Sequence, residues 1–257
     1  MVNIRALRIG QWKGAMKIPS KIRIPGRIAA EIGSDIVSGR LLPGTILETE
    51  VDASSGRNVS RSAYREAVGK LVAKGLVVSR QKVGTRVTEA TQWHLLDPDV
   101  LSWMFSSEPR RDLLAYLFEL RTMVEPEAAA LAATRRRTQE LHAMARALKI
   151  MTEETLHTER GRVADHDFHA SLLAASGNPF LISLSTSVTA AVTWSTKFKD
   201  RTHRLKRNAI PDHVRVYDAI AAGDSKAARK AMTRLIELAL SDAIQVRRKT
   251  APARPRR

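Results

Sequence analysis

The chain has 257 residues, and its 43 Lys and Arg against 26 Asp and Glu give a formal net charge of +17 at pH 7. Cysteine is absent, which excludes disulfide scaffolds, thiolate zinc sites, iron–sulfur clusters and cysteine nucleophiles. Because no stretch approaches the ~18 consecutive apolar residues of a membrane span and the N-terminus shows no signal-peptide core, we expect a cytoplasmic, mainly helical protein with no membrane partner.

The excess positive charge lies at the two ends of the chain. Residues 1–90 hold 16 basic and 7 acidic residues, residues 91–245 hold 21 and 19, and residues 246–257 hold six basic residues and no acidic one. A small basic domain is suited to a polyanion, because each neutralised phosphate releases counterions. The N-terminal part is therefore predicted to bind nucleic acid, whereas the Pro- and Arg-rich C-terminal end is typical of a solvated tail.

The first patterned segment, residues 21–90, predicts a winged helix-turn-helix domain, because three helical patterns precede two short strands. Ser60 is a favourable N-cap for the third helix, and Gly75 ends that helix. The expected elements are a helix that buries Ile28, Ile32 and Ile36, a weaker helix at 48–55, a third helix at 61–74, and a hairpin formed by 76–78 and 84–87.

The start of the third helix is the candidate DNA-contacting surface. A helix N-terminus attracts phosphate, and an arginine can bind a guanine edge through two parallel hydrogen bonds. The tip of the hairpin adds a cation and a glycine that could follow the DNA backbone. An ordinary solvated charged face is the alternative interpretation. The residues predicted to contact DNA are Ser60, Arg61, Ser62, Arg65, Lys82 and Gly84.

Several motifs of this segment resemble the DNA-binding domain of the GntR family of bacterial regulators. They are residues 42–45 (LPGT), 60–67 (SRSAYREA), 71–77 (LVAKGLV) and 83–87 (VGTRV). The resemblance implies that the Ser and Arg residues of the second motif contact bases and phosphates, and that Gly84 lets the wing approach the duplex. The second helix departs from the family pattern: Ala53 and Arg57 replace larger apolar residues, and Val51 replaces a frequent Arg. We therefore expect weaker packing of that helix.

The rest of the chain predicts a connector followed by an antiparallel helical bundle. Residues 91–109 form the connector, and we interpret its two tryptophans, Trp93 and Trp103, as packing contacts between the domains. Strand signals are scarce after it. The six expected helices are 112–133, 139–158, 163–175, 179–200, 212–222 and 226–246.

Three residues of the bundle are candidate metal ligands. Asp165 and His169 lie four residues apart, so they project from the same face of one helix, and His213 begins a later helix that could approach them. A carboxylate and two imidazoles inside a bundle can bind a divalent metal of the Zn, Ni or Mn type. A hydrogen-bonded surface pair is the alternative for the first two residues. Their neighbours His166 and Asp167 face elsewhere on the helix.

Arg121 is the candidate effector-binding residue. It borders the apolar stripe of the first bundle helix, where a guanidinium can clamp a carboxylate through two parallel hydrogen bonds that a lysine cannot match. The alternative is an aliphatic stem packed along the stripe with the charged head in water. We expect Glu125 and Glu127, on the same helix, to be surface partners and not ligands.

The bundle resembles the FCD effector domain of the FadR subfamily at residues 165–172 (DHDFHASL), 177–179 (GNP), 213 (His) and 219–224 (AIAAGD). In the metal-binding members an Asp and three His hold the ion, and by this resemblance Asp165, His169 and His213 are the first three. Leu235 occupies the fourth position, so the site is incomplete. It either holds a three-ligand ion whose open positions accept water or an effector carboxylate, or it has lost the metal.

Two further stretches, 92–103 and 120–126, are most similar to the galactonate-operon repressor group of this subfamily, which also tends to lack the fourth His. The resemblance implies a sugar acid such as galactonate as the effector. The resemblance also implies that the protein is a homodimeric, ligand-responsive transcription regulator. We expect a repressor that leaves the operator of a sugar-acid catabolic operon when the acid binds.

Three alternatives remain open at this point. A regulator of the same subfamily could sense a different small carboxylate. A metal-dependent sugar-acid enzyme would need acid and base groups, and the sequence has no phosphate-binding Gly loop, G-x-S-x-G elbow or dinucleotide fingerprint. A nonspecific DNA binder would leave the large neutral part without a role. The predicted fold is mainly α, with a basic tail at 1–20, a winged helix-turn-helix at 21–90, a connector at 91–109, an all-α FCD-type bundle at 110–246 and a basic tail at 247–257.

Overall fold

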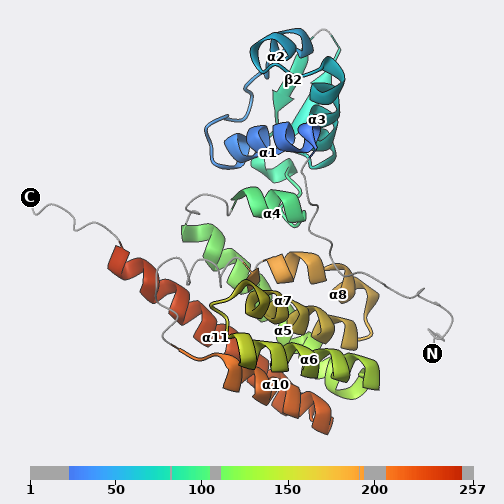
Figure 1. The fold of residues 1–257 in the computed structure, drawn as a ribbon, viewed down its shortest axis with the longest axis vertical. Helices are drawn as coiled ribbons and strands as arrows, with labels where there is room; N and C mark the ends of the chain where they lie inside the picture. Colours follow the sequence, from blue (N-terminus) through green and yellow to red (C-terminus); the bar gives the residue numbers. More distant parts are fainter. Residues whose placement is uncertain (1–22, 82, 105–110, 191, 194–206, 251–257) are drawn as a thin grey trace, which may run out of the picture.

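The computed structural model describes residues 23–81, 83–104, 111–190, 192–193 and 207–250. Figure 1 shows the N-terminal helices and hairpin at one end, the helical bundle at the other, and α4 between them. The fold is mainly helical, as predicted. Its elements are α1 (Ile24–Val37), α2 (Glu50–Gly56), α3 (Arg61–Ala73), β1 (Val77–Arg80), β2 (Gly84–Val87), the 3-10 helix η1 (Ala90–Gln92), α4 (Pro98–Met104), α5 (Arg111–Arg135), α6 (Thr138–Glu154), α7 (Glu159–Ala175), α8 (Pro179–Ser183), α10 (Ile210–Ala222) and α11 (Ser225–Thr250).

The N-terminal domain is a three-helix unit with an antiparallel hairpin, the winged helix-turn-helix that the pattern predicts. The isoleucine stripe of α1 is buried against α3, which contributes Tyr64, Ala67 and Leu71 to the core. Thr49 and Ser60 act as N-caps, because their Oγ atoms accept hydrogen bonds from the first turns of α2 and α3. These caps fix the turn between the two helices and the direction in which α3 starts.

Helix α2 is held mainly by one small residue and by ion pairs. Ala53 is fully buried, while Arg57, at the C-cap, pairs with Glu48 and Glu31. A cavity of about 140 Å³ lies beside Arg57. The cavity is lined by Ile32, Leu41, Ile46, Leu47, Glu48, Arg57 and Tyr64.

The segment predicted as a simple connector contains a helix that belongs to both cores. Helix α4 places Val100 in the core of the N-terminal domain and Leu101 in the core of the bundle. Both tryptophans pack against the N-terminal core; Trp103 lies directly over Gly33 of α1, where a Cβ atom would collide with its indole. Among the described residues the tryptophans therefore fix the connector to one domain, and Leu101 makes the contact with the other.

Polar contacts also tie α4 to both domains. Lys74, which follows α3, forms ion pairs of 2.8 Å with Asp97 and Asp99 at the start of α4. From the bundle side, the Ser187 hydroxyl donates a hydrogen bond to the carbonyl of Leu96. The end of the recognition helix is thus connected through one short segment to the helical domain.

The bundle consists of α5, α6, α7, α10 and α11 around one apolar core (Figure 1). The structure corrects several predicted boundaries, since α6 ends at Glu154 and not at 158, and α7 begins at Glu159 and not at 163. The helix expected at 179–200 is interrupted by a turn at Leu184, after which 185–190 and 192–193 are helical; residues 194–200 lie outside the described part. The last helix, α11, continues to Thr250 and therefore enters the segment predicted as a tail. Within the described residues, no helix has the length and apolar character needed to cross a bilayer.

Candidate DNA-binding surface and ligand pocket

The exposed start of α3 brings together three of the residues predicted to contact DNA. Ser60 Oγ accepts a hydrogen bond from the backbone N–H of Ala63 at 3.1 Å and lies 3.1 Å from Ser62 Oγ. Arg61 is exposed beside them. Ser60 therefore has a structural role as the cap, in addition to any contact with DNA, and the helix end offers backbone N–H groups, hydroxyls and a cation on one surface.

Arg65, one helical turn further, is held by a residue that the sequence did not suggest. Its Nε and Nη2 atoms donate to the two carboxylate oxygens of Glu50 in α2, at 2.8 and 2.6 Å. Hydrogen bonds from Arg65 hold the pKa of the Glu50 carboxyl below its ordinary value. No spacing rule signals this pair, because the two residues are 15 positions apart and meet through the turn between α2 and α3.

The hairpin gives a structural reason for one of the two predicted wing residues. Gly84 begins β2 with φ = +93°, a conformation that favours glycine whether or not DNA is bound. Lys82 lies outside the described residues. Arg80 and Arg86 are exposed on the same hairpin and add two cations that were not predicted.

In the bundle, the three predicted metal ligands converge. Asp165 and His169 come from α7 and His213 from α10; all are buried, and one ligand atom of each lies within 4.8 Å of the others. Asp165 Oδ1 is 3.1 Å from His213 Nε2 and 3.7 Å from His169 Nε2. The alternative of a surface pair is wrong, because both α7 residues are inside the core. His166 and Asp167 do face elsewhere, where they contact each other.

The hydrogen bonds of the two imidazoles leave their Nε2 atoms directed at the carboxylate. His213 Nδ1 donates to the carbonyl of Ala209 at 2.9 Å, and His169 Nδ1 bonds to the Glu125 carboxylate. We therefore assign the hydrogen to Nδ1 in both rings, which leaves an Nε2 lone pair on each. Within the described residues, His213 Nε2 is buried and makes no hydrogen bond. Two imidazole lone pairs and a carboxylate oxygen facing one point fit a divalent cation.

Glu125 corrects a prediction: it is a buried partner of the site and not a surface residue. Its side chain has no exposed area, and its carboxylate accepts from Arg121 Nε at 2.6 Å as well as from His169. Burial alone would raise the pKa of the Glu125 carboxyl, but Arg121 and His169 outweigh burial and lower the pKa to about 2. Glu127 lies at the surface as expected, where it forms a two-point ion pair with Arg229.

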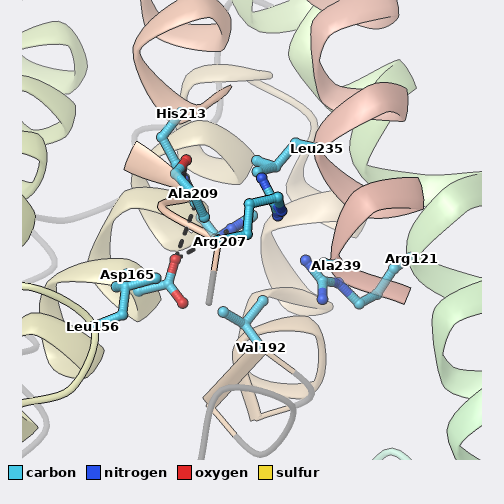
Figure 2. A pocket seen from close by; sticks show the side chains of 10 residues that line it. Arg121, Leu156, Asp165, Val192, Arg207, Ala209, His213, Leu235 and Ala239 are labelled. Atoms are coloured by element: carbon cyan, nitrogen blue, oxygen red, sulfur yellow. Dashed lines mark hydrogen bonds and ion pairs between the residues drawn. The ribbon is translucent and has the colours of Figure 1, made fainter. Parts of the chain in front are cut away.

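Arg121 is buried beside the metal-ligand cluster, with only 3% of its surface exposed. The alternative in which its charged head reaches water is therefore wrong. Glu125 holds its Nε atom, and its guanidinium carbon lies 5.1 Å from the Phe118 ring centre. Figure 2 shows the guanidinium extending toward the pocket, which Arg121 lines.

These groups line one cavity of about 30 Å³, which has room for an ion and a water molecule. Leu235 lies on its wall and supplies an apolar surface where a fourth imidazole would stand. Arg207 is a second cation on the cavity, bonded to Asp212 and Asp242, that the sequence did not suggest. The described lining consists of Arg121, Leu156, Asp165, His169, Val192, Arg207, Ala209, His213, Leu235 and Ala239 (Figure 2).

A winged helix-turn-helix joined to a helical domain is the architecture of a class of DNA-binding regulators. Comparison with family models agrees. Residues 25–87 match the family of bacterial regulatory proteins called gntR, and residues 116–238 match the FCD domain. The chain belongs to the GntR family and to its FadR subfamily with an FCD domain. It is a DNA-binding transcription regulator and not an enzyme.

Individual relatives cover nearly the same length. The chain is 33% identical to the uncharacterised regulator YieP of Escherichia coli K12 (81% of this chain, 90% of the relative) and 30% identical to the galactonate operon transcriptional repressor of the same strain (82% and 92%). It is 32% identical to the regulator LutR of Bacillus subtilis (77% and 90%). A solved structure of Lar, which controls the Listeria monocytogenes agr system, has the same fold, with a TM-score of 0.59 at 18% identity over 86% of this chain and 96% of that one.

Proposed function

We propose that this regulator is a cytoplasmic homodimeric repressor of a sugar-acid catabolic operon, with a DNA-binding domain at 21–90 and an effector domain at 110–246, and that a sugar acid such as galactonate releases it from its operator. The observation that supports an acidic effector is the position of Arg121 beside the Asp165, His169 and His213 cluster on one buried cavity. The similarity to the galactonate operon repressor favours the sugar acid among small carboxylates.

The chemistry of the cavity suits a carboxylate. Asp165, His169 and His213 would hold the divalent cation, which supplies positive charge for the acid when it is bound. Arg121 offers the Nη groups that Glu125 leaves available, and a guanidinium binds a carboxylate through two parallel hydrogen bonds. Leu235 lines the cavity and cannot ligate a metal, so it would not compete with the effector for a bound cation as a fourth imidazole would.

Binding of a sugar acid would have to enlarge this cavity, because 30 Å³ holds little more than an ion and a water molecule. The helices that line the cavity share one apolar core with Leu101 of α4, whose neighbour Val100 lies in the DNA-binding core. A shift of α4 would change the pose of the two recognition helices, which must enter major grooves about one helical turn apart. A coupling free energy of about 1–3 kcal/mol between the sites is sufficient for regulation.

The proposal is tested by binding the purified protein to the DNA upstream of its own gene, with and without a panel of aldonates and other small carboxylates. We expect a specific complex that one aldonate dissociates, measured by gel shift against random competitor DNA. Release by a carboxylate that is not a sugar acid would show that the effector belongs to another class of carboxylates. The proposed role as an operator-binding regulator would then be unchanged. Equal affinity for every duplex would contradict operator recognition itself.

Replacing Arg61 with alanine is expected to weaken operator binding by about 1–3 kcal/mol, or roughly 5- to 150-fold, if its side chain contacts a base edge. The residue is exposed at the start of α3, so the change should leave the fold intact. Fluorescence anisotropy with a labelled operator measures the effect. The matched control is Lys149→Ala on α6, which removes the same charge from an exposed side chain far along the chain. Equal operator affinities of Arg61→Ala and Lys149→Ala would show that Arg61 does not contact a base edge.

A further inference from the structure

The Glu50–Arg65 pair places a carboxylate on the same surface as the predicted DNA contacts. The Arg65 side chain is 72% exposed and that of Glu50 36%. Arg61, at the start of α3, is close enough to act electrostatically on the Glu50 carboxyl and contributes to the lowering of its pKa. Two cations of the recognition helix thus flank one anion of the preceding helix.

Glu50 lies in the first turn of α2, where a carboxylate favours the helix, but neither its ion pair nor general DNA affinity requires it to contact Arg65. An exposed ion pair contributes little to stability, with typical values of about 0–1 kcal/mol. A negative charge facing the phosphate backbone opposes binding to any duplex, since binding depends on neutralising phosphates. The part of its role that bears on DNA is therefore its two-point contact with Arg65.

The geometry of the pair shows what that contribution is. A guanidinium has two edges suited to two-point hydrogen bonding, one formed by Nε with one Nη, and the other formed by both Nη atoms. Glu50 occupies the first edge, because its two oxygens accept from Nε and Nη2. The second edge, with the Nη1 hydrogens and the remaining Nη2 hydrogen, stays available for a guanine edge or a phosphate.

We propose that Glu50 is a positioning residue for DNA recognition: it fixes the Arg65 guanidinium by one edge and leaves the opposite edge for the operator. This inference rests on the proposed contact of Arg65 with DNA. A long arginine side chain loses rotamer freedom when it binds, and holding it in advance reduces that loss for the correct site. Glu50 would then increase the preference for the operator while lowering the affinity for DNA in general.

The test compares Glu50→Ala with Glu66→Ala in the full-length protein. Glu66 is the matched control, because it is next to Arg65 in sequence and carries the same charge, but pairs with Lys70 on its own helix. Anisotropy titrations use the upstream operator and a scrambled duplex at two salt concentrations. We expect Glu66→Ala to raise the affinity for both duplexes by a similar factor. Glu50→Ala should maintain or raise the affinity for the scrambled duplex and lower that for the operator, by about fivefold or more.

A double substitution separates positioning from a change in overall charge. In an Arg65→Ala background, adding Glu50→Ala should cause no further loss of operator preference. If Glu50→Ala instead strengthens operator and scrambled binding equally, as the Glu66 control does, the positioning role is wrong while operator recognition stands. The positioning role would also be wrong if Glu50→Ala lowered operator preference further in the Arg65→Ala background. If Arg65→Ala leaves operator binding unchanged, the proposed contact of Arg65 with DNA fails, and the inference fails with it.

Discussion

Replacing Glu125 with alanine should destabilise the bundle by about 3–5 kcal/mol, the cost of removing one partner from a buried ion pair. The carboxylate has no exposed area and accepts hydrogen bonds from Arg121 and from His169. Its loss leaves the Arg121 guanidinium buried without the anion that neutralises it, and leaves the Nδ1 hydrogen of His169 without its acceptor. Chemical denaturation followed by circular dichroism measures the change in the free energy of unfolding.

Glu127 provides the control, since it is two residues further along the same helix and also pairs with an arginine. That pair, with Arg229, is exposed on both sides, so Glu127→Ala should cost no more than about 1 kcal/mol. The two variants share the helix, the residue type and the loss of one charge, whereas the burial and the partners of the carboxylate differ. Similar losses for the two variants would show that the buried network does not stabilise the bundle.

The contrast between Glu125 and Glu127 also shows that the sequence did not predict which acidic side chains are buried. The spacing of Asp165 and His169 placed both on one face of a helix, and His213 was expected to approach them from a later helix. The structure confirms that the three side chains converge, and metal binding by them stays a prediction. Glu125 lies four residues after Arg121, a spacing that is equally typical of an exposed helical pair. Only the covering of α5 by α7 and α11 buries it, and such long-range packing has no local signature.

Helix boundaries were predictable where capping residues mark them. Asp97 accepts hydrogen bonds from the backbone of Asp99 and Val100, and Pro98 occupies the first position of α4. The start of this helix was therefore marked in the sequence, although the segment was interpreted as a connector. The interruption at Leu184 has no Gly or Pro to indicate it, which explains why one long helix was predicted there.

A divalent metal should stabilise the bundle through Asp165, His169 and His213. At a free metal concentration about 100 times the dissociation constant, binding to the native state alone contributes about 2.7 kcal/mol. We expect Zn²⁺, Ni²⁺ or Mn²⁺ to raise the melting temperature of chelator-treated protein, with about one ion bound per chain by elemental analysis. His213→Ala should abolish both effects, because it removes an imidazole whose Nε2 lone pair faces the other two ligands.

His166→Ala is the control for this experiment, because His166 lies on the same helix but pairs with Asp167 outside the cluster. It should bind metal like the unchanged protein, whereas equal metal binding by His213→Ala would contradict the assigned site. The incomplete ligand set adds a test in the opposite direction. Leu235 lines the same cavity, so Leu235→His should add a fourth ligand and tighten metal binding. If that imidazole closes the open side of the ion, the same variant should respond less to the effector, which would connect the missing histidine to ligand sensing.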